Sequence, residues 1–213
     1  MSLNLDPLLR RYCEMLSSPD LPVMEAIERA TQLKTPKPHD ASDPIQGRLL
    51  RLLSTLAKPK FILEIGTMSA VATINLAKGL VEGGKLTSIE YNYDLQPLIH
   101  EHLTAAGVED SVNVIYGIAM DVIPTITNQI DILYIDAAKR EYKSYVELLI
   151  DQVNIGGLII TDNVLWKGEV VQNDKSTMAQ ALDNFNHYIK KRKDLESVII
   201  PYRDGLSISR KIS

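Results

Sequence analysis

The apolar positions of this chain follow two different periods. Up to about residue 60 they recur every three or four residues, as in an amphipathic helix. Three such segments begin at Asp6-Pro7, Leu21-Pro22 and Asp43-Pro44, and the cluster Thr35-Pro36-Lys37-Pro38 separates the last two. Proline fits the first turn of a helix but disfavours helix in the residue before it. We therefore predict three N-terminal helices, the third with an inward face formed by Ile45, Leu49, Leu52, Leu53 and Leu56.

From Lys60 onward, short apolar runs alternate with helical stretches. The predicted strands are Phe61-Ile65, Lys85-Glu90, Val112-Tyr116, Ile130-Ile135, Leu158-Thr161, Val198-Pro201 and Leu206-Arg210. Helical patterns separate the first five of them, at Ala70-Leu80, Leu95-Ala106, Ala119-Ile126 and Glu141-Val153. Strands that alternate with helices form right-handed crossovers, so these five strands are predicted to be parallel, with helices on both faces of the sheet.

The end of the chain departs from this alternation. After a helix predicted around Met178-Lys190, only the residues from Tyr202 to Gly205 separate the last two strands. That gap is too short for a crossover helix and predicts an antiparallel hairpin at the sheet edge. The predicted fold is therefore α/β and Rossmann-like, with a seven-stranded, mostly parallel sheet. The length would allow two domains, but the pattern favours a single domain, 1-213, with a helical cover (1-59) and a sheet core (60-213).

Composition mainly adds exclusions. The chain has 213 residues, of which 45% are hydrophobic and 23% charged, so wholesale disorder is excluded. The net charge of -4 disfavours non-specific nucleic-acid binding, and the single cysteine, Cys13, excludes an internal disulfide framework and a cysteine-based zinc site. No apolar run is long enough to span a bilayer, and the first residues lack an apolar signal core. We expect a soluble, cytoplasmic enzyme without nucleic-acid or membrane partners.

Acidic residues gather at the predicted carboxyl ends of the strands. They are Glu64 in the first strand, Glu90 at the end of the second, Asp136 after the fourth and Asp162 after the fifth. Acidic side chains at random positions of buried strands would be costly to bury. Ligands of open α/β sheets bind beyond the carboxyl ends of the strands, so we expect the functional site at this edge.

The end of the first strand is compatible with a nucleoside ligand. Gly66 permits a tight turn and a close approach of the backbone to a ligand, and Glu90 lies roughly where an acid meets ribose hydroxyls. The loop Gly66-Thr67-Met68-Ser69-Ala70 has one glycine instead of three, which disfavours a pyrophosphate and hence NAD. S-adenosylmethionine carries no phosphate and fits better. An ordinary strand-to-helix turn is the alternative for this loop, and a nicotinamide dehydrogenase is an alternative for the protein.

Asp136, Asp162 and Asn163 are candidate metal ligands. Two carboxylates and an amide carbonyl are hard oxygen donors, which suit Mg²⁺ or another divalent cation such as Ca²⁺ or Mn²⁺. The alternative is that Asp162 and Asn163 only cap the chain after the strand. Lys139 lies near the predicted start of a helix, where the helix dipole disfavours a cation. Its position suggests a chemical role, although a solvated surface lysine is the simpler explanation.

Taken together, these residues resemble a known family. The chain looks like the metal-dependent O-methyltransferases of the catechol and caffeoyl-CoA type, which use S-adenosylmethionine. The matching stretches are Leu63-Glu64-Ile65-Gly66-Thr67, Ile89-Glu90, Ile135-Asp136-Ala137-Ala138-Lys139 with Tyr142, Gly156-Gly157, Asp162-Asn163-Val164-Leu165-Trp166-Lys167-Gly168, Asp204-Gly205-Leu206 and Gln46-Gly47. The Asp-Ala-x-Lys and Asp-Asn-x-Leu-Trp-x-Gly stretches are specific in combination, whereas Gly66 and Glu90 alone are not.

The resemblance implies a class I methyltransferase fold, a homodimer and a small catechol-like or hydroxycinnamoyl-type acceptor with adjacent hydroxyls. Asp136, Asp162 and Asn163 would bind the metal. The catalytic residues would be Lys139, as the general base, and Asp136. Trp166 and Lys139 would contact the acceptor, although Trp166 could equally pack in the core. The residues expected around the cofactor are Glu64, Gly66, Thr67, Ala72, Glu90, Tyr91, Gly117, Ala119 and Asp136.

One stretch departs from the family pattern. The family usually has Thr-Gly-Tyr-Ser where this chain has Ser69-Ala70-Val71-Ala72, so a hydroxyl that would hold the methionine part of the cofactor is missing. A lost hydrogen bond to a charged group is worth ~1.5–3 kcal/mol. The rival interpretation is therefore a methyltransferase-fold binding protein with weakened or lost S-adenosylmethionine binding. Acceptor recognition is expected to involve residues 36–44 and 166–177, whose sequences do not identify the acceptor.

Overall fold

Three helices precede the sheet, as predicted. The computed structural model describes residues 7–35 and 42–213. The helices are α1 (Pro7–Leu16), α2 (Met24–Lys34) and α3 (Pro44–Ala57). Asp6 and the prolines at 36 and 38, together with most of the predicted acceptor loop 36–44, lie outside the described residues. Among the residues that are described, no helix is both long and apolar enough to cross a membrane.

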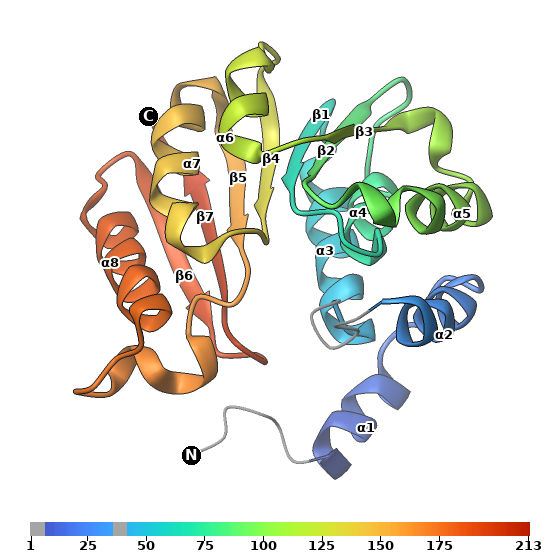
Figure 1. Ribbon diagram of the computed structural model, residues 1–213, viewed down its shortest axis with the longest axis horizontal. Coiled ribbons are helices and arrows are strands. Elements are labelled where there is room, and N and C mark those ends of the chain that lie inside the picture. Colours follow the sequence, from blue (N-terminus) through green and yellow to red (C-terminus); the bar gives the residue numbers. More distant parts are fainter. Residues whose placement is uncertain (1–6, 36–41) are drawn as a thin grey trace.

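The rest of the chain forms a seven-stranded sheet in the order β3-β2-β1-β4-β5-β7-β6 (Figure 1). The strands are β1 (Phe61–Ile65), β2 (Lys85–Glu90), β3 (Val112–Tyr116), β4 (Ile130–Ile135), β5 (Val153–Thr161), β6 (Leu195–Ile200) and β7 (Leu206–Lys211). The strands β1 to β5 are parallel, and β7 pairs antiparallel with both β5 and β6. The predicted C-terminal hairpin is thus confirmed, and the strand order reverses between β1 and β4, where such sheets bind ligands.

Helices cover both faces of this sheet (Figure 1). They are α4 (Val71–Ala77) and α5 (Gln96–Ala106) on one face, together with α3, and α6 (Ala119–Val122), α7 (Tyr142–Leu149) and α8 (Thr177–Lys191) on the other. Successive residues of β1 point into opposite cores. Leu63 packs in the core beneath α7 and α8, whereas Ile62 packs in the core beneath α4 and α5. This alternation produces the Rossmann-like arrangement that the sequence predicted.

The inward face of α3 differs from the prediction. Its buried residues are Gln46, Gly47, Leu50 and Ser54. Leu52 is 56% exposed and Leu56 is 71% exposed, so these two leucines were assigned wrongly, whereas Leu49 and Leu53 are partly buried against the core beneath α4 and α5. The physical reason is the close packing of α3 on α4: a Cβ on Gly47 would lie 2.7 Å from Asn75 Nδ2. Small and polar residues therefore form the contact, and Gln46 is directed into the protein.

Candidate functional site

Backbone hydrogen bonds tie the carboxyl ends of the strands together. The Asp136 N–H donates to the carbonyl of Ile65 at 2.9 Å, and the Asp162 N–H donates to the carbonyl of Ile135 at 3.0 Å. These bonds lie just past the strand ends, so β1, β4 and β5 end side by side. The predicted acidic residues therefore lie along one edge of the sheet, at the reversal of strand order.

Position 66 requires a glycine because the backbone after the neighbouring strand β4 lies too close for a side chain. Its φ is +100°, and a Cβ at this position would lie 2.1 Å from the carbonyl oxygen of Asp136. The close approach that the sequence assigned to a ligand is thus made, in the described structure, to the backbone after β4. Only glycine brings the loop after β1 and the segment of Asp136 this close together.

Glu90 anchors the loop after β1. It is 3% exposed. Its Oε2 accepts hydrogen bonds from the N–H groups of Met68 at 2.7 Å and Thr67 at 3.2 Å, and its Oε1 accepts one from Asn92 N–H at 2.8 Å. Such charge-assisted bonds are strong. Because a carboxylate has about four acceptor sites and three are occupied, Glu90 can fix the loop and still accept a hydrogen bond from a ligand hydroxyl.

The loop keeps a glycine-like conformation although it carries Ala70. The φ and ψ of Ala70 are 62° and 15°, in the left-handed region that an alanine seldom adopts. The side chain of Ala70 is fully buried in the core beneath α4 and α5, and that of Ala72 is mostly buried in the same core. His102 Nδ1 donates to the carbonyl of Ser69 at 2.9 Å and so fixes the loop from α5.

Glu64 is a fully buried acid in β1. Its Oε2 accepts hydrogen bonds from Thr73 Oγ1 at 2.5 Å and Ser88 Oγ at 2.6 Å. Its Oε1 is buried and has no partner among the described residues. Burial raises the pKa of Glu64 to about 8, so the carboxyl group carries a proton at neutral pH. A cationic group beside it would stabilise the ionised form.

Asp162 is the centre of a second polar group. It is 3% exposed. Its Oδ2 accepts a hydrogen bond from Gln46 Nε2 at 2.6 Å, and its Oδ1 accepts one from Asn163 N–H at 2.7 Å. Burial, and then repulsion by Asp136, raises the pKa of Asp162 to about 6. Negative charge is thus concentrated where water is largely excluded.

These residues fit a hard divalent cation. Lys139 is the ion-pair partner of Asp136, and a cation would compensate the remaining charge of the two carboxylates. Within residues 7–35 and 42–213, no group of three or more His, Cys, Asp or Glu side chains could hold a metal ion. The amide oxygen of Asn163 therefore stays the predicted third protein ligand.

Lys139 is not a solvated surface lysine. It begins the short 3₁₀ turn Lys139–Glu141, and its side chain is only 13% exposed. Its Nζ pairs with Asp136 and lies 5.3 Å from the centroid of the Tyr142 ring. The ion pair offsets the unfavourable helix dipole and places the amine at the same strand end as the candidate metal ligands.

The remaining predicted site residues are Gly117, Ala119, Tyr91 and Trp166, and their surroundings point to no particular chemistry. The Gly117 N–H donates to the carbonyl of Glu90 at 2.8 Å, and Ala119 begins α6 and is 9% exposed. Tyr91 is 82% exposed. Trp166 is half-buried and packs against the core beneath α7 and α8, so its packing role is observed and its acceptor role stays a prediction.

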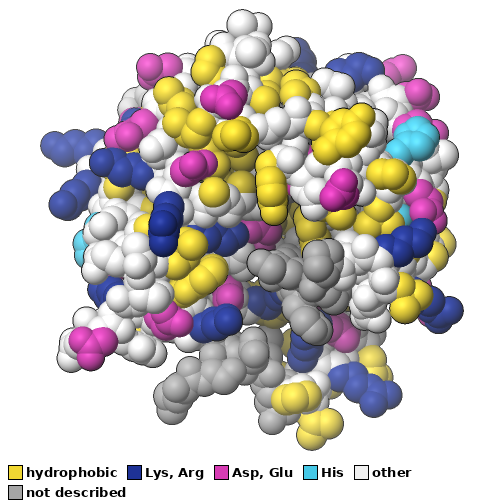
Figure 2. Space-filling view, viewed as in Figure 1, with side chains coloured by type: hydrophobic (Ala, Val, Ile, Leu, Met, Phe, Trp, Pro, Cys, Tyr) yellow, Lys and Arg dark blue, Asp and Glu magenta, His cyan; other side chains and the backbone are white. Residues whose placement is uncertain are grey.

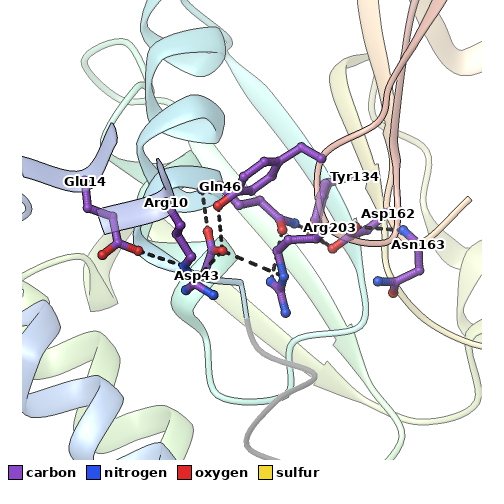
Figure 3. A network of polar contacts seen from close by, with 9 residues as sticks. Arg10, Glu14, Asp43, Gln46, Tyr134, Asp162, Asn163 and Arg203 are labelled. Carbon is purple, nitrogen blue, oxygen red and sulfur yellow. Dashed lines mark hydrogen bonds and ion pairs between the residues drawn. The ribbon is translucent and has the colours of Figure 1, made fainter. Parts of the chain in front are cut away.

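Two residues of this region had no predicted role. Gln46 lies in the first turn of α3, and Arg203 lies in the turn between β6 and β7. Arg203 Nη1 donates to Gln46 Oε1 at 3.1 Å, so both belong to the polar network that reaches Asp162 (Figure 3). The available signal was the stretch Gln46-Gly47, which matched the family pattern and lies three residues after the cap Asp43 in a helix otherwise rich in leucine.

Known proteins resemble the chain along most of its length. A family model described as O-methyltransferase matches residues 14–212. The catechol O-methyltransferase of Niastella koreensis is 30% identical over 162 residues, which cover 74% of this chain and 73% of that protein. The caffeoyl-CoA O-methyltransferase of Populus kitakamiensis is 29% identical over 206 residues, or 89% and 86% of the two chains.

A solved structure extends the similarity to the fold. The O-methyltransferase TomG from Streptomyces achromogenes, determined in complex with SAM, has a TM-score of 0.86 and 26% identity, with 98% of this chain and 97% of that chain covered. The chain therefore has the Rossmann-like class I methyltransferase fold and belongs to the O-methyltransferase family.

Proposed function

We propose that the protein transfers a methyl group from S-adenosylmethionine to a hydroxyl of a small acceptor with adjacent hydroxyls, assisted by a divalent cation. The observation that carries this proposal is the burial of Asp162 beside Asp136, at the edge where Glu64 and Glu90 also lie. Family membership supplies the reaction type. The strand edge supplies negative charge that a cationic cofactor and a metal would complement.

S-adenosylmethionine supplies a methyl group that is already activated on a sulfonium. Glu90 would accept a hydrogen bond from a ribose hydroxyl, and the unpaired Oε1 of Glu64 would face positive charge of the cofactor. The cofactor-bound structure of the similar protein supports this choice of cofactor. The residues that would line the cofactor are those predicted above: Gly66, Thr67, Ala72, Tyr91, Gly117, Ala119 and Asp136.

Asp136, Asp162 and Asn163 would hold the cation, which when bound lowers the pKa of an acceptor hydroxyl. Lys139 Nζ, as the neutral amine and no longer ion-paired with Asp136, would accept the hydroxyl proton. The enclosing residues would align the acceptor oxygen with the methyl group, and such alignment can contribute ~7–11 kcal/mol. Trp166 would form one wall of the acceptor site.

An alternative is a binding protein with the same fold and little affinity for S-adenosylmethionine. Ala70 and Ala72 favour it, because they replace a glycine and a serine of the family pattern. The retained group of Asp136, Lys139, Asp162 and Asn163 opposes it, since binding alone does not require that set. Calorimetric titration with S-adenosylmethionine separates the two: no heat at millimolar ligand favours the alternative.

We also propose a homodimer, built on the exposed apolar faces of α1 and α3. Tyr12 is 60% exposed and Met15 is 69% exposed on α1, and Leu52 and Leu56 are exposed on α3. Hydrophobic side chains are visible at the lower edge of the molecule, where Figure 1 places α1 (Figure 2). Sedimentation of the wild type and of Met15→Glu tests this: the variant should sediment as a monomer.

Two further expectations accompany this proposal. Residues 1–59 would be a cover of the same domain as the sheet core 60–213, so mild proteolysis should release neither part as a stable fragment. The protein would act in the cytoplasm, which cell fractionation tests.

The decisive assay follows methyl transfer from labelled S-adenosylmethionine to catechols and hydroxycinnamoyl esters, with Mg²⁺ or with a chelator. Methylated product with Mg²⁺ and none with the chelator is expected. Absence of product from every such acceptor would contradict the proposed acceptor class, and equal product in both conditions would contradict the metal.

A further inference from the structure

Gln46 connects the first turn of α3 to the carboxylate of Asp162, although 116 residues separate them in the sequence. Its Nε2 donates to Asp162 Oδ2 at 2.6 Å and lies 3.5 Å from the hydroxyl oxygen of Tyr134. Gln46 is 2% exposed. A buried amide with this short a contact limits the rotation of the carboxylate that it touches.

The position of Gln46 is set by the start of α3. Asp43 caps the helix, and its Oδ1 accepts a hydrogen bond from the Gln46 N–H at 2.9 Å. Asp43 Oδ2 in turn accepts one from Tyr202 Oη at 2.7 Å and lies 3.4 Å from Arg10 Nη2 (Figure 3). Gly47 lets the same turn pack closely against the side chain of Asn75. The backbone that carries Gln46 is therefore held from several directions.

The orientation of the amide is set by Arg203. Its Nη1 donates to Gln46 Oε1 at 3.1 Å, and a guanidinium can only donate. The oxygen of the amide therefore faces Arg203, and the nitrogen faces Asp162. A flipped amide would place a donor against the guanidinium and an acceptor against the carboxylate, so both contacts would be lost.

Arg203 comes from a turn that is joined to the loop after β5. Its φ of 51° lies in the left-handed region, and its Nε lies 3.8 Å from Asp43 Oδ2. Asp204 and Gly205, which follow Arg203, accept backbone hydrogen bonds from that loop. The Leu165 N–H donates to the carbonyl of Asp204 at 2.7 Å, and the Val164 N–H donates to the carbonyl of Gly205 at 3.1 Å. The C-terminal hairpin, α3 and the end of β5 thus meet at one carboxylate.

We infer that Gln46 is a positioning residue, which fixes the carboxylate of Asp162 in one rotamer for cation binding and is itself oriented by Arg203. With Oδ2 engaged by Gln46 and Oδ1 by the Asn163 N–H, rotation of the carboxylate would break both contacts. The inference rests on the proposed metal role of Asp162. It adds a residue from the N-terminal helices to the support of that site.

The test compares Mn²⁺ binding to the full-length wild type and to Gln46→Met, without acceptor or cofactor, by calorimetry and by electron paramagnetic resonance. Methionine has a similar length and cannot donate a hydrogen bond. Loss of an outer partner of a metal ligand lowers metal affinity about 10–100-fold, so a weakening of at least about tenfold is expected. Arg203→Met should weaken binding less, because the amide of Gln46 is still present but is free to flip.

Ser54→Ala is the matched control. Ser54 is buried in the same helix and donates to the carbonyl of Leu76 at 2.7 Å, away from Asp162. This variant should lower the melting temperature and leave the Mn²⁺ affinity unchanged, which separates helix stability from positioning. Wild-type or tighter Mn²⁺ binding by Gln46→Met would overturn the inference.

If the wild type binds no Mn²⁺, the metal role in the proposed function is contradicted. A crystal structure of metal-free Gln46→Met then still tests the inference about Gln46. A rotated Asp162 carboxylate in the variant would still support positioning by Gln46, and an unchanged rotamer would overturn it.

Discussion

The two ends of the candidate site are held in different ways. The loop after β1 is held through its backbone, because Glu90 accepts hydrogen bonds from the N–H groups of Thr67 and Met68. At the end of β5, the carboxylate of Asp162 is instead contacted by the side chains of Gln46 and Tyr134. Every residue except proline offers an N–H, whereas only a few side chains can replace a particular amide or carboxylate.

This contrast explains why the departure at Ser69-Ala70-Val71-Ala72 leaves the loop intact. Ala70 adopts the left-handed conformation that a glycine would adopt, and the backbone contacts to Glu90 are present. We therefore expect substitutions in the cofactor loop to change affinity by moderate factors. Substitutions around Asp162 and Lys139 should instead remove turnover.

The largest effect is expected for Asp162→Ala, which removes a proposed metal ligand. Since an outer partner alone is worth 10–100-fold, metal-dependent turnover should fall by more than about 100-fold, while the affinity for S-adenosylmethionine stays nearly unchanged. Initial rates at saturating cofactor measure this. Asp194→Ala, just before β6, is the control, and a wild-type rate in Asp162→Ala would remove the metal role.

Lys139→Ala should produce the next largest loss. A general base contributes 10²–10⁴-fold, so turnover should fall by about 100-fold without a change in cofactor affinity. Lys143→Ala is a matched control one turn further on, because Lys143 is 54% exposed and pairs only with Glu147 among the ion pairs of the described residues. Equal rates for wild type and Lys139→Ala would exclude the lysine as the base.

Glu64 should make stability depend on pH at the cofactor end. Its pKa is raised from 4.5 to about 8 by burial, so between these values the folded protein retains a proton that the unfolded chain loses. Stability should therefore fall as the pH rises from about 5 to about 8, by an amount on the order of 4 kcal/mol at most. Urea unfolding of Glu64→Gln should show a flatter pH profile than the wild type.

Asp162, whose raised pKa of about 6 acts in the same direction, is present in both proteins and does not affect this comparison. A pH profile that is identical in wild type and Glu64→Gln would show that Glu64 ionises normally in the folded protein.

The smallest effect is expected from restoring the family pattern in the cofactor loop. Ala72→Ser would return the missing hydroxyl and should raise the affinity for S-adenosylmethionine by about tenfold, the lower end of what one such hydrogen bond provides. Ala70→Gly is the companion variant. It relieves the left-handed alanine but loses a buried methyl group, and the two contributions, each about 1 kcal/mol, nearly cancel in stability. Titration calorimetry of Ala72→Ser that shows unchanged affinity would mean that position 72 does not contact the cofactor.

The sheet could be predicted because its strands are short apolar runs separated by clear breaks. The four-residue link between the last two strands allowed only a hairpin, and β7 does pair antiparallel with β6. The first half of β5 was missed because Asn154, Gly156 and Gly157 interrupt its apolar pattern, and the helix predicted up to Val153 ends at Leu149. The face of α3 was right for Leu49 and Leu53 and wrong for Leu52 and Leu56, because a leucine pattern marks apolarity and not direction.

The acidic strand ends could likewise be placed from the sequence, since parallel strands end at a common edge. The contacts to Gln46 and Arg203 could not. They depend on where α3 and the β6–β7 turn lie in space, and Arg203 and Gln46 are 157 residues apart in the chain. A polar residue near the start of an amphipathic helix is normally interpreted as solvent-facing.

The central claim is that the carboxylates at the end of β4 and β5 make methyl transfer depend on a divalent cation. The most direct measurement is the turnover of the wild type with a catechol acceptor, in a chelator and after addition of excess Mg²⁺. The account predicts that turnover is lost in the chelator and returns with Mg²⁺ in the wild type but not in Asp162→Ala. Full turnover in the chelator would contradict it.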